Sequence, residues 1–276
     1  MTVTYEDVVK ARQTQNKIIR KTNLEFSETF SKICGANVYL KNEYEQKTGS
    51  FKIRGAYSKI RSLTEDEKNK GVVAASAGNH SQGVAFASHN EGIPCTIVMP
   101  KTASPAKVSA TKGYGAKVVL EGITYDESWA HAQKISAETN ATIVHAFDDS
   151  HVIAGQGVIG LEIMEQLPEV DEIYVPIGGG GLVAGIITAV KEKYPRVKII
   201  GVESSAYPAM KKSLESNSLE TVTGLTTIAD GISVKTPGKL TFDIIKGKID
   251  KIVTVDDSDI INAMFLLMER SKAVVE

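Results

Sequence analysis

The sequence predicts an α/β protein built from two open, mostly parallel twisted sheets with helices on both faces. Short runs rich in Val and Ile recur along the chain, and helix-length segments separate them. Such nearly continuous apolar runs are typical of strands in a parallel sheet that is covered on both faces. Signals for helix starts and ends fall between the runs, as right-handed βαβ crossovers require.

The expected strands fall into two groups. Those between residues 71 and 147 can form one small sheet, and those after residue 170 can form a second sheet together with 37–41 and 251–255. The runs themselves are 71–76, 95–99, 116–121, 141–147, 172–178 and 197–204. Residues 147–150 (FDDS) break the alternation. We therefore expect a large discontinuous domain of residues 1–54 and 148–276 and a small domain of residues 55–147.

Three local signals mark helices. Thr4 and Asp7 have the spacing of a capping box, which predicts a helix starting after Thr4. Pro105 opens a pattern that ends near Gly113. Pro168 follows the apolar pattern of residues 158–167 and should end that helix.

Composition excludes several classes of function. The 276 residues are 42% hydrophobic and 24% charged, as in an average globular protein. The net charge of −1 provides no basic excess for a nucleic acid. No apolar run reaches the ~20 residues that span a bilayer, and the first residues lack the apolar stretch of a signal peptide. Cys34 and Cys95 make neither a disulfide framework nor a metal spacing, so a cytoplasmic protein is expected.

The first motif with possible chemistry is GSFKIRG, residues 49–55, in which Lys52 stands between Phe51 and Ile53. Apolar surroundings disfavour the charged form of a lysine, so its pKa falls and its amine becomes a nucleophile suited to Schiff-base chemistry. A solvated lysine at a helix start is the ordinary alternative, and spacing alone does not exclude it.

The second motif is SAGNHSQG, residues 76–83, which follows an expected strand directly and precedes a helical pattern. A loop of small residues at the carboxyl end of a parallel strand, leading into a helix, favours an anion such as a carboxylate or phosphate. Asn79 can donate a hydrogen bond to a phenolate oxygen. His80 is equally well interpreted as a structural histidine.

The third motif is GGGG, Gly178–Gly181, between an expected strand and an expected helix. Four glycines let backbone N–H groups approach an anion at a helix start, whereas a tight turn needs only one or two. A competing interpretation uses Gly179, Gly181 and Ala184 as a G-x-G-x-x-A dinucleotide motif, with Glu203 as the ribose-binding acid. That alternative, an NAD-dependent oxidoreductase, leaves the other two motifs without a role.

These segments together resemble a known family. KTGSFKIRGA, SAGNHSQGVA, VIAGQGVIGLEI, PIGGGGLVAGI and TIADGI occur in the order found in fold-type II pyridoxal-phosphate enzymes, which share the tryptophan synthase β-like fold. Within that family the chain most resembles the threonine dehydratase (threonine ammonia-lyase) and serine racemase group, in particular the catabolic dehydratases. The resemblance implies pyridoxal 5′-phosphate as cofactor, a small β-hydroxy amino acid as substrate and a homo-oligomer, either dimer or tetramer.

The resemblance also implies roles for individual residues. Lys52 would bind the cofactor covalently and later take the Cα proton, Phe51 would pack against the pyridine ring, and Asn79 would bind the ring's 3-oxygen. The phosphate would lie on Gly178, Gly179, Gly180, Gly181 and Leu182, Gly231 would line the ring, and the substrate carboxylate would lie on Ser76, Ala77, Gly78, Asn79 and His80. The implied reaction is α,β-elimination of L-threonine to 2-oxobutanoate and ammonia, with L-serine to pyruvate as a secondary reaction.

Two positions depart from relatives. Serine racemases resemble this chain but have a serine where Ala77 stands, and that hydroxyl serves as their second acid–base group. Since a methyl group cannot transfer a proton, we expect dehydration with little racemisation. Glu203 matches one acid of the family's divalent-cation site, but residues 204–210 contain no second acid. No metal is therefore expected, and Glu203 is only a weak candidate ligand.

The last departure is at Glu276. Family members continue past this glutamate into a loop whose serine or cysteine faces the pyridine nitrogen. We expect the chain to be either a fragment of a longer protein or a truncated variant with impaired activity. A cofactor-binding protein without turnover is therefore a further alternative, beside serine racemase and serine dehydratase.

Overall fold

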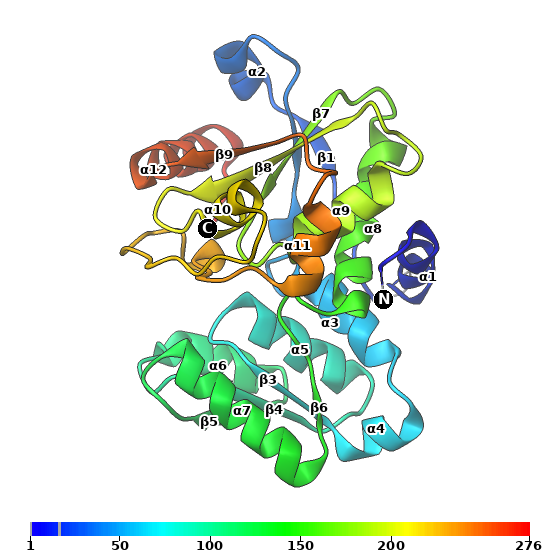
Figure 1. The fold of residues 1–276 in the computed structure, drawn as a ribbon, viewed down its shortest axis with the longest axis vertical. Coiled ribbons are helices and arrows are strands. Elements are labelled where there is room, and N and C mark those ends of the chain that lie inside the picture. The colour runs from blue at the N-terminus through cyan, green and yellow to red at the C-terminus, as the bar shows by residue number, and fades with distance from the viewer. Residues whose placement is uncertain (1, 16–17) are drawn as a thin grey trace.

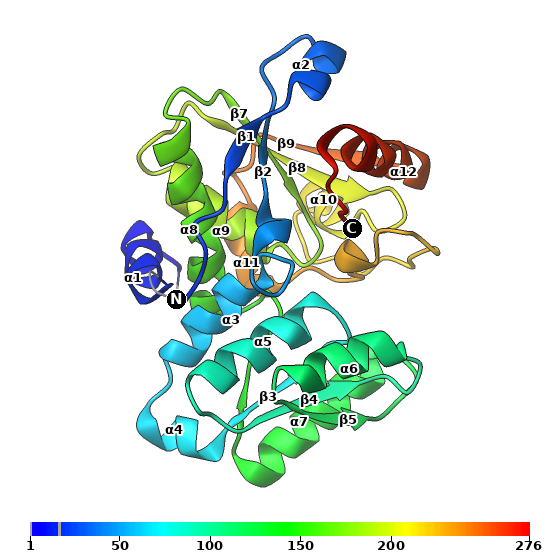
Figure 2. The same cartoon turned by 180° about the vertical axis from the view of Figure 1, so that it is seen from behind.

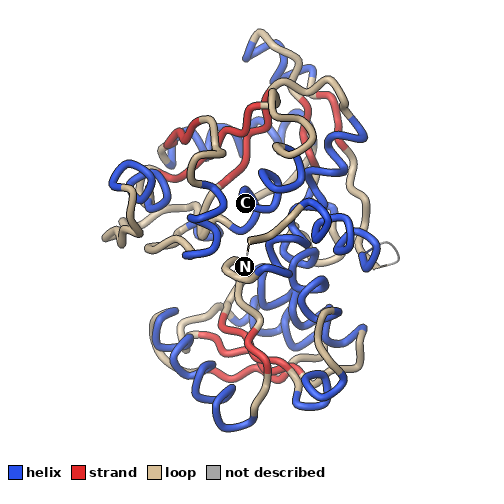
Figure 3. The backbone as a smooth tube through the Cα atoms, turned by 45° about the vertical axis from the view of Figure 1, so that its right-hand side comes forward, coloured by secondary structure: helices blue, strands red, loops and turns tan. Residues whose placement is uncertain are grey.

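The computed structural model describes residues 2–15 and 18–276. Its parallel strands form two separate sheets, one of four strands in the order β5-β4-β3-β6 and one of three in the order β7-β8-β9 (Figures 1 and 3). All pairings within these two sheets are parallel. The strands are β3 Val72–Ala75, β4 Cys95–Met99, β5 Lys117–Leu120, β6 Thr142–Ile143, β7 Glu172–Pro176, β8 Lys198–Ser204 and β9 Lys251–Val255. This arrangement confirms the α/β prediction.

The two sheets are not equally covered. Every residue of β3 is buried, as predicted for a strand with both faces covered. In β7, by contrast, Ile173 and Val175 are buried whereas Tyr174 is 63% exposed. The prediction of burial on both faces is therefore wrong for β7, because the described residues cover its Ile173 and Val175 side and leave the other in contact with solvent.

Residues 37–41 do not join the large sheet, so that prediction is also wrong. Strand β2, Tyr39–Lys41, pairs antiparallel with β1, Leu24–Phe26. Helix α2, Glu28–Cys34, connects them and ends at Gly35 in the left-handed conformation. A short connection can join antiparallel neighbours, whereas a parallel pair needs a long crossover. The resulting β1–β2 arm, with α2 at its tip, projects beyond the rest of the molecule (Figure 2).

The predicted helix boundaries are confirmed. Asp7 Oδ2 accepts a hydrogen bond from Thr4 N at 3.0 Å, and Asp7 N donates to Thr4 Oγ1 at 3.2 Å, which completes the cap of α1. Helix α6 has Pro105 in its first turn and ends at Gly113, and α8 ends two residues before Pro168. The helices not yet given are α1 Tyr5–Gln15, α3 Lys52–Arg61, α4 Glu65–Lys70, α5 Asn79–Asn90, α6 Pro105–Gly113, α7 Tyr125–Thr139, α8 Ser150–Gln166, α9 Gly181–Val190, α10 Ala209–Ser216, α11 Lys239–Ile245 and α12 Asp257–Leu266, with short turns at Glu43–Glu45, Asp230–Ile232 and Leu267–Ser271.

Helices α3, α8 and α9 pack at backbone contact. A Cβ on Gly155 of α8 would lie 2.6 Å from Arg54 O of α3, and one on Gly185 of α9 would lie 2.4 Å from Ile153 O of α8. Such close approach tolerates no side chain at these positions. The stack therefore holds the start of α3, at Lys52, in a defined position relative to the start of α9, at Gly181.

The chain contains no membrane-spanning helix within the part that the structure describes, since none there is both long and apolar enough. The described cysteines, Cys34 and Cys95, are both free thiols. The division into domains of residues 1–54 with 148–276 and 55–147 stays a prediction. The four-stranded sheet nevertheless draws all its strands from residues 72–143, and the three-stranded sheet draws its strands from residues 172–255.

Candidate active site

Lys52 is the first residue of α3 and follows a turn in which Gly49 has a φ of +73°. Its Nζ donates a hydrogen bond to Ala146 O at 3.1 Å and lies 5.3 Å from the centre of the Phe51 ring. Desolvation by burial lowers the pKa of Lys52 to about 8. The partly buried side chain and its hydrogen bond argue against the ordinary alternative of a solvated lysine. The lowered pKa gives this amine a larger neutral fraction near neutral pH than a lysine in water has.

The segment of residues 144–147 joins the predicted motifs. Val144 O accepts a hydrogen bond from His80 Nε2 at 2.9 Å, and Ala146 O accepts the one from Lys52. The ring of Phe147 lies against the glycine loop, since a Cβ on Gly179 would be 2.3 Å from it. The buried lysine, the loop at the start of α5 and the glycine loop at the start of α9 thus meet on one short stretch of chain.

The glycine loop Gly178–Gly181 is packed by protein at every Cβ position. The nearest atoms to the four positions belong to Ile232, Phe147, Met210 and, again, Phe147, at distances between 2.3 and 3.1 Å. Gly180 has a φ of +95° and precedes α9 without any side-chain cap. The glycines are therefore required by packing as well, and the first N–H groups of α9 have no partner within the helix.

The loop of residues 76–80 has the same construction. Helix α5 begins at Asn79, and Gly78 before it makes no side-chain cap. Ser76 Oγ accepts a hydrogen bond from Gly78 N at 3.2 Å, which shapes the turn. The free N–H groups at the start of α5 consequently form a second place for an anion, beside Lys52 rather than on the glycine loop.

His80 has a fixed protonation state. Burial, with a smaller contribution from the charge of Lys52, lowers its pKa to about 3. The neutral ring donates from Nε2 to Val144 O, so Nδ1 is left as an acceptor, and this buried atom has no partner. An acceptor repels a carboxylate. The expectation that His80 binds a substrate carboxylate therefore stays a prediction, and only the backbone N–H of His80 offers such a carboxylate a donor.

Glu276 is a member of the site that sequence reasoning did not identify as one. Asn79 Nδ2 donates to Glu276 Oε2 at 2.6 Å, across 197 positions of sequence. The same oxygen is the nearest atom, at 3.9 Å, to a Cβ built on Gly231, which otherwise faces open space. No local signal distinguishes Glu276 from a surface glutamate, because its neighbours in space belong to α5 and to the 230–232 turn.

The Glu203 carboxylate accepts hydrogen bonds from the protein backbone. It is fully buried, and its donors are Met210 N at 2.8 Å and Lys211 N at 2.9 Å, at the start of α10. Desolvation raises its pKa to about 7. With both oxygens occupied, Glu203 is not free to bind a ribose, which removes the basis of the dinucleotide interpretation.

The described residues contain no cluster of three possible metal ligands. The expectation that the protein binds a divalent cation weakly or not at all stays a prediction.

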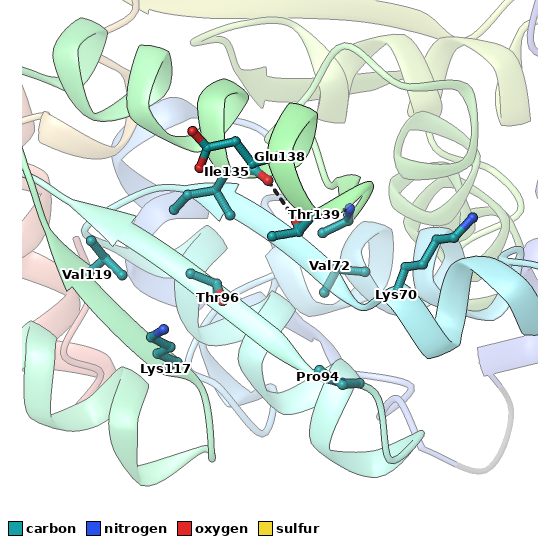
Figure 4. Close-up of a pocket in the computed structure, with 10 residues that line it drawn as sticks. Lys70, Val72, Pro94, Thr96, Lys117, Val119, Ile135, Glu138 and Thr139 are labelled. Carbon is teal, nitrogen blue, oxygen red and sulfur yellow. Dashed lines mark hydrogen bonds between the residues drawn. The ribbon is translucent and has the colours of Figure 1, made fainter.

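A pocket of about 270 Å³ lies elsewhere, at the amino ends of the small-sheet strands (Figure 4). Val72, Thr96 and Lys117, which begin or lie near the start of β3, β4 and β5, line it together with Ile135 and Thr139 of α7. The loop of residues 76–80 follows the opposite, carboxyl end of β3. Ligands of open parallel sheets bind at the carboxyl ends, so this pocket is separate from the candidate site.

The site therefore joins a buried lysine to two uncapped helix starts at the carboxyl ends of parallel strands, as an enzyme with a covalently bound, anionic cofactor requires. Residues 16–276 match the family described as pyridoxal-phosphate dependent enzyme, and the chain belongs to that family. The NAD-dependent alternative is thereby overturned.

Comparison with individual relatives narrows the similarity to particular enzymes of this family. The chain is 50% identical over 274 residues to L-threonine ammonia-lyase of Thermotoga maritima, covering 99% of this chain and 68% of that enzyme. Serine racemase from Dictyostelium discoideum has a TM-score of 0.94 and 38% identity, covering 100% of this chain and 89% of that one. Threonine deaminase isoform 2 from Solanum lycopersicum has a TM-score of 0.95 and 36% identity, covering 100% and 78%.

The residues present fit pyridoxal phosphate. The amine of Lys52 has the lowered pKa that covalent attachment needs. The start of α9 offers backbone N–H groups to a phosphate. In the turn before Lys52, the buried hydroxyls of Thr48 and Ser50 have no hydrogen-bond partner, and buried polar groups in native proteins usually have one. These unpaired groups indicate a place for a polar ligand.

Proposed function

We propose that the protein is an L-threonine ammonia-lyase, which converts L-threonine to 2-oxobutanoate and ammonia and, as a secondary reaction, L-serine to pyruvate. The observation that supports this most is the meeting of Lys52 and the glycine loop on residues 144–147. The 50% identity to the Thermotoga maritima enzyme supports the choice of threonine. Serine dehydration follows because serine lacks only the methyl group of threonine.

The proposed roles are those that the family resemblance implies, and the geometry of the site supports them. Gly178–Gly181 and Leu182 hold the phosphate, Phe51 and Gly231 line the ring, and Asn79 donates to the ring's 3-oxygen. When bound there, pyridoxal phosphate acts as an electron sink for negative charge at the substrate Cα. The backbone N–H groups of Ser76–His80 orient the substrate carboxylate. Lys52 Nζ, as the neutral amine, takes the proton from Cα.

The test is to load the purified protein with pyridoxal phosphate and assay keto-acid and ammonia release from threonine and serine. Reduction with borohydride should fix the cofactor on Lys52, as peptide mapping would show. Lys52→Ala should lower turnover by about 10²–10⁴-fold or more, whereas Lys112→Ala, at an exposed position of α6, should not. A visible band without ammonia release would instead support a binding protein without turnover.

Serine racemase is the second candidate, favoured by the TM-score of 0.94 to the Dictyostelium discoideum enzyme. Ala77 argues against it, because its methyl group cannot deliver a proton to the opposite face of Cα. Formation of D-serine at a rate near that of ammonia release would favour the racemase.

We also infer a cytoplasmic, homo-oligomeric protein, either a dimer or a tetramer. Two free thiols suit a reducing compartment. On the β1–β2 arm, Phe26 is 48% and Tyr39 36% exposed, with ring centres 5.4 Å apart. Exposed aromatic pairs of this kind are typical of interfaces. Light scattering would measure the oligomer, and Phe26→Ser should weaken it if the arm contributes.

A further inference from the structure

Glu276 and Asn79 form a side-chain contact that the proposed roles do not explain. Asn79 Nδ2 donates to Glu276 Oε2 at 2.6 Å, so the amide that should bind the cofactor is already engaged on one side. Asn79 is partly buried at the start of α5, whereas Glu276 is exposed and follows the 267–271 turn. The side chain of Glu276 also borders the open space beside Gly231.

We propose that Glu276 is a positioning residue, which orients the Asn79 amide so that its second N–H group faces the 3-oxygen of the cofactor. An asparagine amide has two donor hydrogens on nitrogen and an acceptor oxygen. An ionised carboxylate only accepts. Glu276 therefore selects the rotamer of Asn79 that directs nitrogen, rather than oxygen, toward both anions. This inference rests on the proposed function.

Glu276 has two opposing effects on the bound cofactor: orienting Asn79 favours binding, whereas its negative charge disfavours it. A carboxylate near the cofactor's phenolate destabilises the phenolate by like-charge repulsion. Glu276→Gln removes that repulsion, but glutamine can donate as well as accept, so Asn79 is no longer held in one orientation. If orientation dominates, the substitution weakens cofactor binding and reduces its visible band. If charge dominates, the substitution strengthens cofactor binding and increases the visible band.

The experiment measures cofactor binding rather than turnover. Pyridoxal phosphate is titrated into the apoprotein, followed by its visible absorption and by the emission of Trp129, the single tryptophan. Trp129 packs on His145 at 5.2 Å between ring centres, and His145 packs on Phe147 at 4.6 Å. Glu276→Gln should weaken binding about three- to tenfold, the effect of one ordinary hydrogen bond. It should also lower the ratio of visible to near-ultraviolet absorption.

Two controls separate positioning from general damage. Glu269→Gln, in the same terminal segment but with an exposed side chain that pairs with Arg270, should leave binding unchanged. In an Asn79→Ala background, Glu276→Gln should have no further effect, because its action passes through Asn79. Unchanged thermal unfolding of the apoprotein would show that the variant folds.

Three outcomes would overturn the inference. They are wild-type affinity and spectrum in Glu276→Gln, tighter binding in that variant, or an equal effect with and without Asn79. Failure of the proposed function would look different, because the unsubstituted protein itself would then either form no visible band with pyridoxal phosphate or form the band and release no ammonia from threonine.

Discussion

Burial lowers the pKa of Lys52 to about 8, whereas a lysine in water titrates near 10.5. Among the described residues its Nζ has one hydrogen-bond partner, the neutral acceptor Ala146 O. No carboxylate pairs with Nζ among the ion pairs of the described residues. An acid beside it would restore the charged form and remove the nucleophile.

The pH dependence of cofactor attachment should report this pKa. Below about 8 the amine is mostly protonated, so the rate of covalent attachment to the apoprotein should rise with pH and level off above about 8. Stopped-flow absorption between pH 6 and 10 would measure it. A rate that continues to rise toward pH 10.5 would indicate a solvated lysine instead.

Ala77 gives a second test at the scale of one residue. Ala77→Ser places a hydroxyl where the methyl group now lies, and we expect D-serine formation to rise relative to pyruvate formation, since the hydroxyl can transfer a proton. Chiral chromatography of the products from L-serine would measure the ratio. An unchanged ratio would mean that a hydroxyl at this position does not reach Cα.

At the scale of elements, the four-glycine loop needs glycine for two reasons: neighbouring side chains leave no room for a Cβ, and an anion must approach the backbone N–H groups. Gly179 lies directly against the Phe147 ring, and Gly180 lies against Thr241 and Met210. Thr241 Oγ1 donates to Gly179 O at 2.6 Å, which secures the loop from the side of α11. The free N–H groups of α9 are thereby held in place before any ligand arrives.

Gly179→Ala should therefore be costly. The new methyl group would meet the Phe147 ring at 2.3 Å, and overpacking of this kind costs about 1–3 kcal/mol. Displacing Phe147 should also weaken phosphate binding. Gly113→Ala in α6 is the matched control, because nothing lies within 4 Å of its Cβ position and alanine favours a helix. Thermal unfolding and cofactor titration would show both effects, and equal stability of the two variants would contradict the packing argument.

At the scale of the whole molecule, a buried ion network centred on Arg54 joins α3, the helix that begins at Lys52, to α8 and to strand β2. Arg54, fully buried two residues after Lys52, donates to Glu43 Oε2 at 2.8 Å and to Glu162 Oε1 at 2.7 Å. Lys41 of β2 donates to Glu162 Oε2 at 2.6 Å. The network thus ties α3 and the β1–β2 arm to the same residue of α8, Glu162.

Removing one charge from this network should be far more harmful than removing one on the surface. Glu162→Gln leaves Arg54 and Lys41 undercompensated, and breaking such a buried pair costs about 3–5 kcal/mol. Glu165→Gln, one turn further along α8, breaks pairs with Arg12 and Lys21 whose side chains are 35% and 50% exposed, at a cost of about 1 kcal/mol or less. Urea unfolding of both variants would measure the difference, and similar midpoints would contradict it.

Local signals in the sequence predicted much of this structure. The runs that became β3 to β5 and β7 to β9 are recognisable because strand formation in a parallel sheet needs only a short apolar stretch. Thr4, Pro105 and Pro168 mark helix ends because caps act within one turn. The motifs around Lys52, Asn79 and Gly178–Gly181 identified the residues that the structure brings together.

Other features depended on contacts between distant segments. The antiparallel pairing of β2, the exposed face of β7 and the fixed tautomer of His80 follow from neighbours that no local pattern identifies. Glu276 beside Asn79 is the clearest case, since 197 positions separate them.

The sequence by itself determined the order of the strands and helices and the residue types available for chemistry, because propensity, capping and periodicity act over a few residues. Only the tertiary structure decided which of those residues are neighbours, which amine loses water and which carboxylates are already occupied. The reason is physical: desolvation and hydrogen-bond partners are supplied by packing between α3, α5, α9 and the 144–147 segment, and packing is not a local property of the chain.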